Sequence, residues 1–262
     1  LLQDHRTAAD GEIFPLDMAE NSVDDLYVGC KKNMSDRVKT ELLERELNNS
    51  PEFKTVWQIG ETNATIPNDN LTENHSVAIY VYTNSRFNLY QVFNNAVRTD
   101  KQIYKDKTFT WYSLFFLLTE AILKETQNGC KLTYRGTNVE FNKNVLNKQV
   151  RFGQFASSSV DRTEAEVFGD VSCFEIRTCE GVDLTKYSSF PEEKEVLIPP
   201  YEKFNVIDIK TRTDHEDLWC ETVYTLESTG VRSDLNCAFF TNQVEKHQTT
   251  AFNNNVFCRC IH

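Results

Sequence analysis

Three short segments of the sequence carry side chains that could do chemistry together. In the first, an apolar stretch ends at Arg135 and Gly136. A guanidinium can bind a diphosphate or a carboxylate through two parallel hydrogen bonds, and a glycine lets the backbone come close to a ligand. In the second, Ser157 and Ser159 fall on one face of an extended chain, and Phe155 offers a surface for stacking. Each segment taken alone is more typical of a solvated surface than of a site.

The third segment holds two acidic residues, Glu193 and Glu195, before the apolar run 196–198. If this segment is extended, both carboxylates lie on one face, and like charges held together require a cationic ligand or a raised pKa. A solvated charge run is the alternative. O-glycosidases also use two carboxylates, but theirs flank a bond at about 5 to 9.5 Å and usually come from separate elements. A serine hydrolase needs an elbow such as Gly-x-Ser-x-Gly, which the sequence lacks.

The elements that must position these segments divide the chain into a mainly helical part, 1–128, and a mainly β part, 129–262. Ser22 and Asp25 form a capping box that predicts a helix start, and Ser50-Pro51 predicts a second one. Apolar residues at helical spacing predict a largely buried helix over 109–126. The polar stretch 62–74 is expected to be a surface loop. The apolar run 75–83 fits either a strand or a buried helix.

After Gly129 the pattern becomes strand-like, with one helical segment at 162–168. Strands are predicted at 131–134, 149–156, 171–178, 195–198, 204–209, 218–226 and 236–240. Helices first and strands later indicate an α+β fold, in which a helical region packs on a mostly antiparallel pair of sheets. We expect a single domain over 1–262.

Composition excludes several classes of protein. The chain has 262 residues, 28 Lys and Arg against 39 Asp and Glu, and a net charge of -11, which argues against binding to phosphate backbones. The longest apolar stretch, near residues 115–118, is far shorter than the roughly 20 residues that cross a bilayer. The 5 histidines show no metal-ligand spacing, so no metal is expected. Cys258-x-Cys260 with His262 fits disulfide chemistry better than a metal site.

The compartment follows from the 8 cysteines and from a cluster of glycosylation sequons. The sequons begin at Asn33, Asn48, Asn63, Asn70 and Asn74. Asn48 is the doubtful one, because Pro51 follows its Ser50. Together these features indicate an extracellular glycoprotein whose signal peptide has been removed. A lipid anchor stays open.

The three segments in this order resemble the vertebrate extracellular mono-ADP-ribosyltransferases, whose signature is Arg, then Ser-x-Ser, then Glu-x-Glu. The resemblance covers almost the whole chain. It includes residues 16–21, Asp24-Asp25, Tyr27, Gly29-Cys30, Tyr134-Arg135-Gly136, residues 151–155 with the following serines, Phe168-Gly169, Thr178-Cys179 and residues 195–200.

The resemblance implies a role for each residue of the three segments. Arg135 would bind the pyrophosphate of NAD, Gly136 would lie beside the nicotinamide carboxamide, and Phe155 would pack against the nicotinamide ring. Ser157 would hold the nicotinamide ribose and position Glu195. Glu195 would bind a ribose hydroxyl and stabilise an oxocarbenium-like transition state.

The acceptor side of the reaction is implied in the same way. Glu193 would orient and activate the guanidinium of an acceptor arginine. The segment 186–191 resembles the family's substrate-recognition turn, in which Tyr187 or Phe190 would contact the target protein. Anchoring of the loop in an apolar patch is the equal alternative for both rings.

For the cysteines, the resemblance implies bridges Cys30–Cys237 and Cys130–Cys179. Cys173, Cys220, Cys258 and Cys260 depart from that pattern, and their pairing stays open, with bridges from the C-terminal tail to Cys220 or Cys173 as the default.

The implied activity is transfer of a single ADP-ribose from NAD, or NADP, to arginine side chains of extracellular or surface proteins, with release of nicotinamide. Two alternatives remain at this point. One is an NAD glycohydrolase acting at the same site, and the other is a surface glycoprotein that retains the fold without catalysis.

Overall fold

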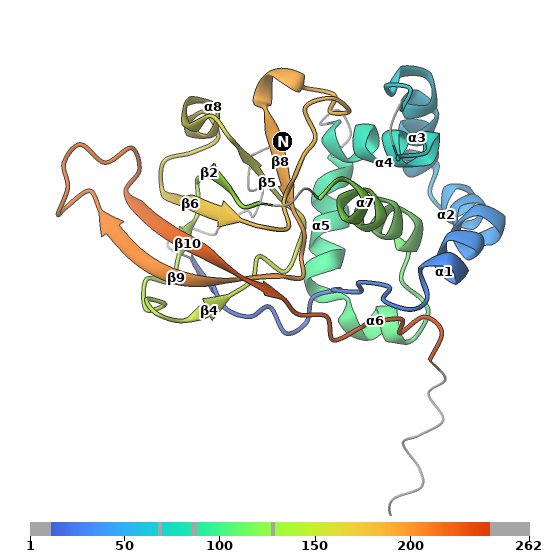
Figure 1. The fold of residues 1–262 in the computed structure, drawn as a ribbon, viewed down its shortest axis with the longest axis horizontal. Coiled ribbons are helices and arrows are strands. Elements are labelled where there is room, and N and C mark those ends of the chain that lie inside the picture. Colours follow the sequence, from blue (N-terminus) through green and yellow to red (C-terminus); the bar gives the residue numbers. More distant parts are fainter. Residues whose placement is uncertain (1–11, 68–69, 85–87, 127–128, 242–262) are drawn as a thin grey trace, which may run out of the picture.

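The computed structural model describes residues 12–67, 70–84, 88–126 and 129–241. Helices from the first half of the chain lie on one side of the molecule, and strands from the second half form the other side (Figure 1). The predicted α+β class is confirmed, and so is the change from helix to strand near Gly129.

The helical part has one long run followed by shorter helices. Its elements are α1 (Lys31–Arg37), the π-helix η1 (Val38–Leu42), α2 (Leu43–Asn49), α3 (Pro51–Asn63), α4 (Glu73–Thr83), α5 (Leu89–Thr99), α6 (Lys101–Lys105) and α7 (Tyr112–Glu125). The predicted start at Ser50-Pro51 is confirmed, because the Ser50 side chain accepts a hydrogen bond from the Phe53 N–H and Pro51 is the first helical residue.

The predicted helix start at Ser22 is wrong, since residues 22–27 have no helical structure. The carboxylates that suggested a cap bind backbone N–H groups from the far end of the chain instead. Asp24 accepts from the Leu235 N–H at 3.0 Å and Asp25 from the Cys237 N–H at 2.9 Å. Long-range hydrogen bonds thus replace the local cap that the sequence suggested.

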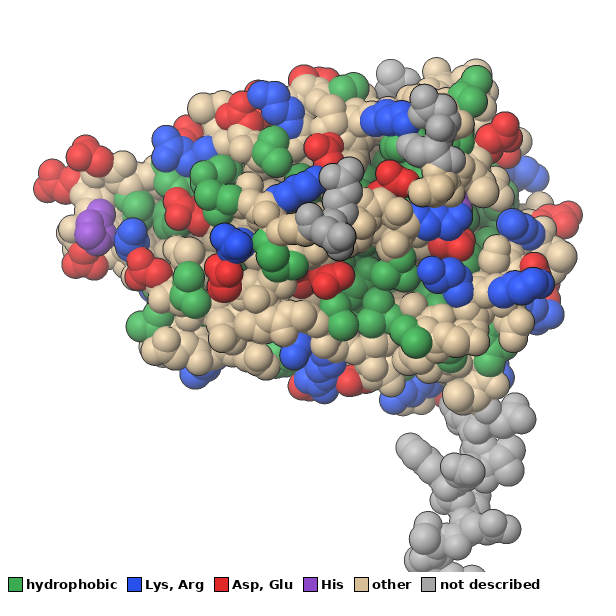
Figure 2. Space-filling model, in the orientation of Figure 1, with side chains coloured by type: hydrophobic (Ala, Val, Ile, Leu, Met, Phe, Trp, Pro, Cys, Tyr) green, Lys and Arg blue, Asp and Glu red, His purple; other side chains and the backbone are tan. Residues whose placement is uncertain are grey.

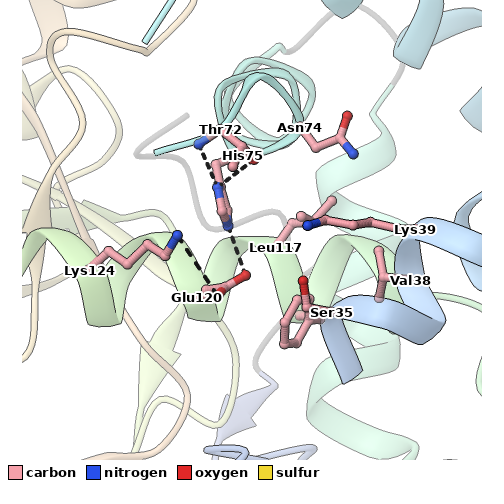
Figure 3. Close-up of a pocket in the computed structure, with 10 residues that line it drawn as sticks. Ser35, Val38, Lys39, Thr72, Asn74, His75, Leu117, Glu120 and Lys124 are labelled. Carbon is pink, nitrogen blue, oxygen red and sulfur yellow. Dashed lines mark hydrogen bonds and ion pairs between the residues drawn. The ribbon is translucent and has the colours of Figure 1, made fainter. Parts of the chain in front are cut away.

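Two buried helices, α4 and α7, form the centre of the helical layer. The run 75–83, ambiguous in sequence, is helical, and residues 75–79 are buried without a break. His75 on α4 connects it to α7, since its Nε2 lies 3.0 Å from Glu120 Oε2 while its Nδ1 accepts from the Thr72 N–H (Figure 3). The imidazole therefore caps α4 and joins it to α7 at the same time.

The strands form an eight-stranded mixed sheet in the order β4-β9-β10-β6-β2-β5-β8-β7. Their bounds are β2 (Lys131–Thr137), β4 (Gln149–Val150), β5 (Ala156–Ser159), β6 (Ser172–Thr178), β7 (Val182–Asp183), β8 (Glu195–Ile198), β9 (Glu202–Thr211) and β10 (Thr222–Val231). β1 (Ile13–Phe14) and β3 (Glu140–Phe141) form a separate parallel pair, and α8 (Arg162–Glu166) follows β5.

The eight strands behave as two sheets that share one connection. β2 pairs with β5 only at Tyr134 and Ser159, so this single pair joins β4-β9-β10-β6-β2 to β5-β8-β7. Leu197 of β8 packs in the same core as the helices, whereas Ile198 packs in a second core with residues of β4, β6, β9 and β10. The short sheet β5-β8-β7 therefore lies between the helical layer and the larger sheet.

Three strand predictions need correction. The run 149–156 contains β4 and the first residue of β5, with an irregular segment between them. Residues 218–221 precede β10, and residues 236–240 form turns rather than a strand. The last segment satisfies its backbone by binding the N-terminal part of the chain, as the Cys237 N–H bond to Asp25 shows.

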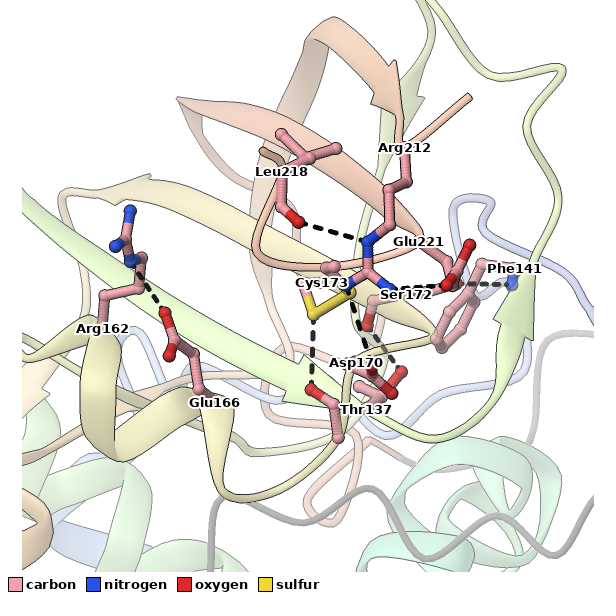
Figure 4. The surroundings of a disulfide bond; sticks show 12 residues. Thr137, Phe141, Arg162, Glu166, Asp170, Ser172, Cys173, Arg212, Leu218 and Glu221 are labelled. Atoms are coloured by element: carbon pink, nitrogen blue, oxygen red, sulfur yellow. Dashed lines mark hydrogen bonds and ion pairs between the residues drawn. A yellow bond between two sulfur atoms is a disulfide. The ribbon is translucent and has the colours of Figure 1, made fainter. Parts of the chain in front are cut away.

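Both disulfides implied by the resemblance are present, joining Cys30 to Cys237 and Cys130 to Cys179. A third joins Cys173 on β6 to Cys220, just before β10 (Figure 4). This bridge settles the pairing of Cys173 and Cys220, which the sequence had left open. The expected bridges from the C-terminal tail to these two cysteines are therefore wrong. Cys258 and Cys260 lie outside the described residues.

Acidic and basic side chains are interspersed over the face shown in Figure 2, without a continuous basic surface on that face. Among the described residues, no helix combines the length and apolar character needed to cross a bilayer.

Candidate functional site

The structure brings Arg135, Ser157 and Glu195 together where the two sheets meet. Arg135 lies on β2 and is only 3% exposed. Its Nη1 donates a hydrogen bond of 2.5 Å to the Ser157 carbonyl oxygen on β5. The guanidinium therefore spans the junction that the backbone crosses through a single residue pair.

Ser157 and Glu195 lie on adjacent antiparallel strands. Ser157 is opposite Leu197, and Ser159 is opposite Glu195, so the side chains of Ser157 and Glu195 are diagonal neighbours on one face. Within the described part of the chain, neither the Ser157 hydroxyl nor either Glu195 carboxylate oxygen completes a hydrogen bond of ordinary geometry, although the hydroxyl lies near enough to favour the carboxylate. Buried polar atoms without partners are costly, and they mark a place where a ligand can supply the missing bonds.

The pKa of the Glu195 carboxyl group is raised above its ordinary value. Burial raises its pKa to about 7, and the nearby charge of Glu193 adds to the rise. The Ser157 hydroxyl and the Arg135 guanidinium act in the opposite direction by favouring the carboxylate. A carboxyl group poised near neutral pH beside a fixed cation is typical of a catalytic site.

A tyrosine from the helical layer completes this cluster, and the sequence analysis missed it. Tyr82 on α4 donates to the Phe155 carbonyl oxygen at 3.2 Å and accepts from Asn94 Nδ2 at 3.1 Å. Burial raises the pKa of Tyr82 and the Glu195 charge adds to the rise, while the Asn94 amide and the Ser157 hydroxyl act in the opposite direction. The only sequence signal was a polar hydroxyl within the ambiguous run 75–83.

Glu193 reaches the site through a turn, not through the extended segment that the sequence suggested. Residues Pro191–Glu193 form a 3₁₀ helix, and Lys194 is left-handed at φ 46°, so the strand begins only at Glu195. Ser159 Oγ fixes this turn by donating to the Glu193 carbonyl oxygen at 2.7 Å. Lys194 adds an ion pair of 2.9 Å with Asp161. The second serine of the Ser-x-Ser segment thus positions the first acidic residue.

Gly136 and Phe155 both take part in close packing. Gly136 is needed for close backbone packing, because a Cβ there would collide with the carbonyl oxygens of Ala165 and Gly169. Phe155 is 0% exposed and stacks on Phe93 at a centroid distance of 5.7 Å. Its ring therefore belongs to the core, which corrects the expectation of an exposed stacking surface for nicotinamide.

The aromatic residues of the segment 186–191 separate into two roles. Tyr187 is 4% exposed and packs in the helical core, which corrects the interpretation of it as an exposed recognition residue. Phe190 is half-buried at the start of the 3₁₀ turn that carries Glu193. Of the two rings, Phe190 is the more exposed.

The predicted sequons all lie in the helical part. Asn33, Asn48, Asn63 and Asn70 are exposed, and Asn74 is half-buried. Ser76 of the last sequon is buried and donates to the Thr65 carbonyl oxygen. In the described ranges no group of three or more His, Cys, Asp or Glu residues could hold a metal ion.

This arrangement combines a cation, a hydroxyl and a buried carboxylate with a second carboxylate on an adjacent turn. It suits stabilisation of a cationic sugar-like transition state next to a bound diphosphate. The second carboxylate suits an incoming guanidinium.

Comparisons with known proteins agree with that chemistry. A family model described as NAD:arginine ADP-ribosyltransferase matches residues 16–223. Rat ecto-ADP-ribosyltransferase 5 is 36% identical over 245 residues, covering 87% of this chain and 77% of the relative. The human protein of the same name is 34% identical, with 87% and 81% covered. Mouse GPI-linked NAD(P)(+)--arginine ADP-ribosyltransferase 1 is also 34% identical, with 86% and 73% covered.

A solved structure gives the same result for the fold. The eukaryotic mono-ADP-ribosyltransferase ART2.2, as a mutant in complex with NADH, is 27% identical and superposes with a TM-score of 0.69, covering 86% of this chain and 98% of that one. The chain belongs to the NAD:arginine ADP-ribosyltransferase family.

Proposed function

We propose that this protein transfers a single ADP-ribose from NAD to arginine side chains of proteins outside the cell and releases nicotinamide. One observation carries the proposal: Arg135, Ser157 and Glu195 meet at one junction, and Glu193 lies on the adjoining turn. The helical part and the sheets act here as one domain, since Tyr82 of α4 contacts the catalytic strands.

The unpaired polar atoms of the site fit NAD as the donor substrate. The Ser157 hydroxyl and the Glu195 oxygens, which lack partners in the described structure, suit the hydroxyls of the nicotinamide ribose. A guanidinium has five N–H donors, so Arg135 can bind diphosphate oxygens while it holds the Ser157 carbonyl. The relatives named for NAD(P) support NADP as a second donor.

The reaction breaks the bond between the ribose C1′ and the nicotinamide nitrogen. The bonding electrons leave with nicotinamide, and the ribose develops positive charge that the ionised Glu195 stabilises. A guanidinium nitrogen of the acceptor then bonds to C1′ and loses one proton, which Glu193 accepts. Glu193 also aligns the guanidinium by pairing with its planar fork.

Phe190 supplies the contact with the acceptor protein in this proposal, because it begins the turn that presents Glu193. Substituting Phe190 by Ala should raise the KM for a protein acceptor far more than for agmatine, a small guanidine. Equal effects on both acceptors would assign Phe190 to loop anchoring.

The relatives named ecto- and GPI-linked enzymes support a position at the outer cell surface, with lipid as the means of attachment. Phosphatidylinositol-specific phospholipase C should release the protein from intact cells. Retention after treatment would contradict the anchor. The same location makes the sequons at Asn33, Asn63 and Asn70 available for glycosylation.

The test of the activity is incubation of the protein with labelled NAD and agmatine. We expect labelled ADP-ribosyl-agmatine and one nicotinamide per adduct. Nicotinamide and free ADP-ribose without the adduct would identify an NAD glycohydrolase. If neither product forms, the protein is a non-enzymatic surface protein with this fold.

A further inference from the structure

A second cavity lies in the helical part, among residues that the catalytic cluster does not use. It has a volume of about 420 Å³, within the range of about 300–1,000 Å³ typical of small-molecule sites. Its walls come from the end of α2, the first turn of α3 and the loop before α7. The lining residues are Arg45, Glu46, Asn49, Ser50, Phe53 and Lys107 through Trp111.

Aromatic rings form the apolar wall of this cavity. Phe53 and Trp111 meet edge to face with their centroids 5.3 Å apart, and Phe109 is a third lining ring. Trp111 is the most accessible of the three at 9% exposed, against 2% for Phe109 and 0% for Phe53. Such a wall favours a flat aromatic group, which can pack against the accessible edge of Trp111 in offset or edge-on geometry.

The polar wall contains a carboxyl group whose hydrogen bonding is incomplete. Glu46 is 4% exposed, and its Oε2 accepts from the Ser113 N–H at 3.0 Å, at the start of α7. Its Oε1 has no hydrogen-bond partner within the described residues. Capping of α7 therefore accounts for the hydrogen bond of one Glu46 oxygen. The other oxygen has no such partner among the described residues.

Positive charge surrounds the same cavity. Arg45 and Lys107 both line it, and the N-terminal end of α3, a 13-residue helix, opens beside it at Ser50. A helix N-terminus carries a partial positive charge that favours anions. An anion at this place meets Lys107 and also Arg45, which shares its charge with Glu41 at 3.2 Å, provided that Glu46 holds a proton.

We propose that this cavity binds a small aromatic carboxylate, whose ring packs against Trp111 and whose carboxylate accepts a hydrogen bond from the Glu46 carboxyl group between Arg45 and Lys107. The site stands apart from NAD, so its test does not depend on transferase activity. Ring contacts connect this cavity to the catalytic cluster. Trp111 contacts Phe93, and Phe93 stacks on Phe155, which lies two residues before Ser157.

The protonation of Glu46 gives the site a pH dependence of known sign. Burial raises the pKa of Glu46 to about 8, so the group donates a hydrogen bond at neutral pH and becomes a repelling anion above it. Tyr27 and Tyr112, which also face Glu46, stay neutral because burial raises the pKa of each.

Titration calorimetry with benzoate tests the proposal, with acetate and benzyl alcohol as probes that lack the ring or the charge. We expect one saturable site for benzoate and binding at least tenfold weaker for either control probe. Above pH 8 the affinity for benzoate should fall about tenfold per pH unit. Glu46→Gln should remove that fall, since an amide donates at every pH.

Variants at the rim separate recognition from folding. Lys107 has a positive φ of 61°, which Asn tolerates, so Lys107→Asn removes the charge with little backbone strain. It should weaken benzoate binding at least fivefold, whereas Lys105→Asn outside the cavity should not. No saturable binding of benzoate at millimolar concentration would overturn the proposal. Equal binding of benzyl alcohol, or unchanged affinity in Lys107→Asn, would overturn it as well.

Discussion

The buried ion pair between Asp24 and Arg151 allows a quantitative test of how the catalytic strands are supported. Arg151 Nη1 lies 2.7 Å from Asp24 Oδ2, and both side chains are 0% exposed. The guanidinium also donates to the Met18 carbonyl oxygen at 2.8 Å, and Asp24 Oδ1 accepts from the Leu235 N–H at 3.0 Å. The pair thus joins both ends of the described chain to the segment that leads into β5.

Asp24→Asn keeps the shape of the side chain and removes its charge, which leaves the Arg151 guanidinium buried without a counterion. Breaking a buried pair in this way costs about 3–5 kcal/mol, out of the about 5–15 kcal/mol that typically separates folded from unfolded states. We therefore expect a loss of roughly a fifth or more of the free energy of unfolding. The double variant Asp24→Leu/Arg151→Met should lose less than Asp24→Asn, because no unpaired charge stays buried.

Urea unfolding followed by circular dichroism measures these free energies. The matched control is Asp36→Asn, which removes an ion pair with Lys32 whose side chains are 58% and 87% exposed, and it should cost at most about 1 kcal/mol. A loss below about 1 kcal/mol for Asp24→Asn would refute the assignment of a dominant structural role to the pair. A double variant less stable than Asp24→Asn would contradict the desolvation argument.

Three further predictions concern the site itself. Ser159→Ala removes the bond that fixes the Glu193 turn, and it should lower transfer to agmatine about tenfold while nicotinamide release changes less, as product analysis would show. Because the pKa of Glu195 is raised to about 7, kcat/KM should fall about tenfold per pH unit below pH 7, and a pH profile flat down to pH 5 would contradict this. Replacing Cys173 and Cys220 by Ala opens a loop closed over 47 residues, and thermal or urea unfolding should show a loss of up to about 4 kcal/mol.

Features set by a few adjacent residues were predictable from the sequence. Ser50-Pro51 starts a helix because the cap and the constrained proline act within one turn. β8 spans 195–198 as predicted, since its apolar residues are bounded by charge on one side and by two prolines on the other. That Arg135, Ser157 and Glu195 act at one site was implied by the resemblance, and no local pattern encodes it.

Features set by distant contacts were not predictable. Asp25 looked like a helix cap, but its partner is the Cys237 N–H, more than 200 residues away. Phe155 looked exposed because a polar segment follows it, whereas its ring fills a core built by α4, α5 and α7. Tyr82 joins the site only because α4 packs on Phe155, directly before β5, which required knowing that the run 75–83 is a helix.

The central claim is that Glu195 drives cleavage of NAD while Glu193 directs ADP-ribose to arginine. The most direct measurement compares nicotinamide release with ADP-ribosyl-agmatine formation in the unmodified protein, in Glu193→Gln and in Glu195→Gln. We predict both products for the unmodified protein, nicotinamide and free ADP-ribose but no adduct for Glu193→Gln, and neither product for Glu195→Gln. Full transfer by Glu193→Gln, or undiminished nicotinamide release by Glu195→Gln, would contradict the claim.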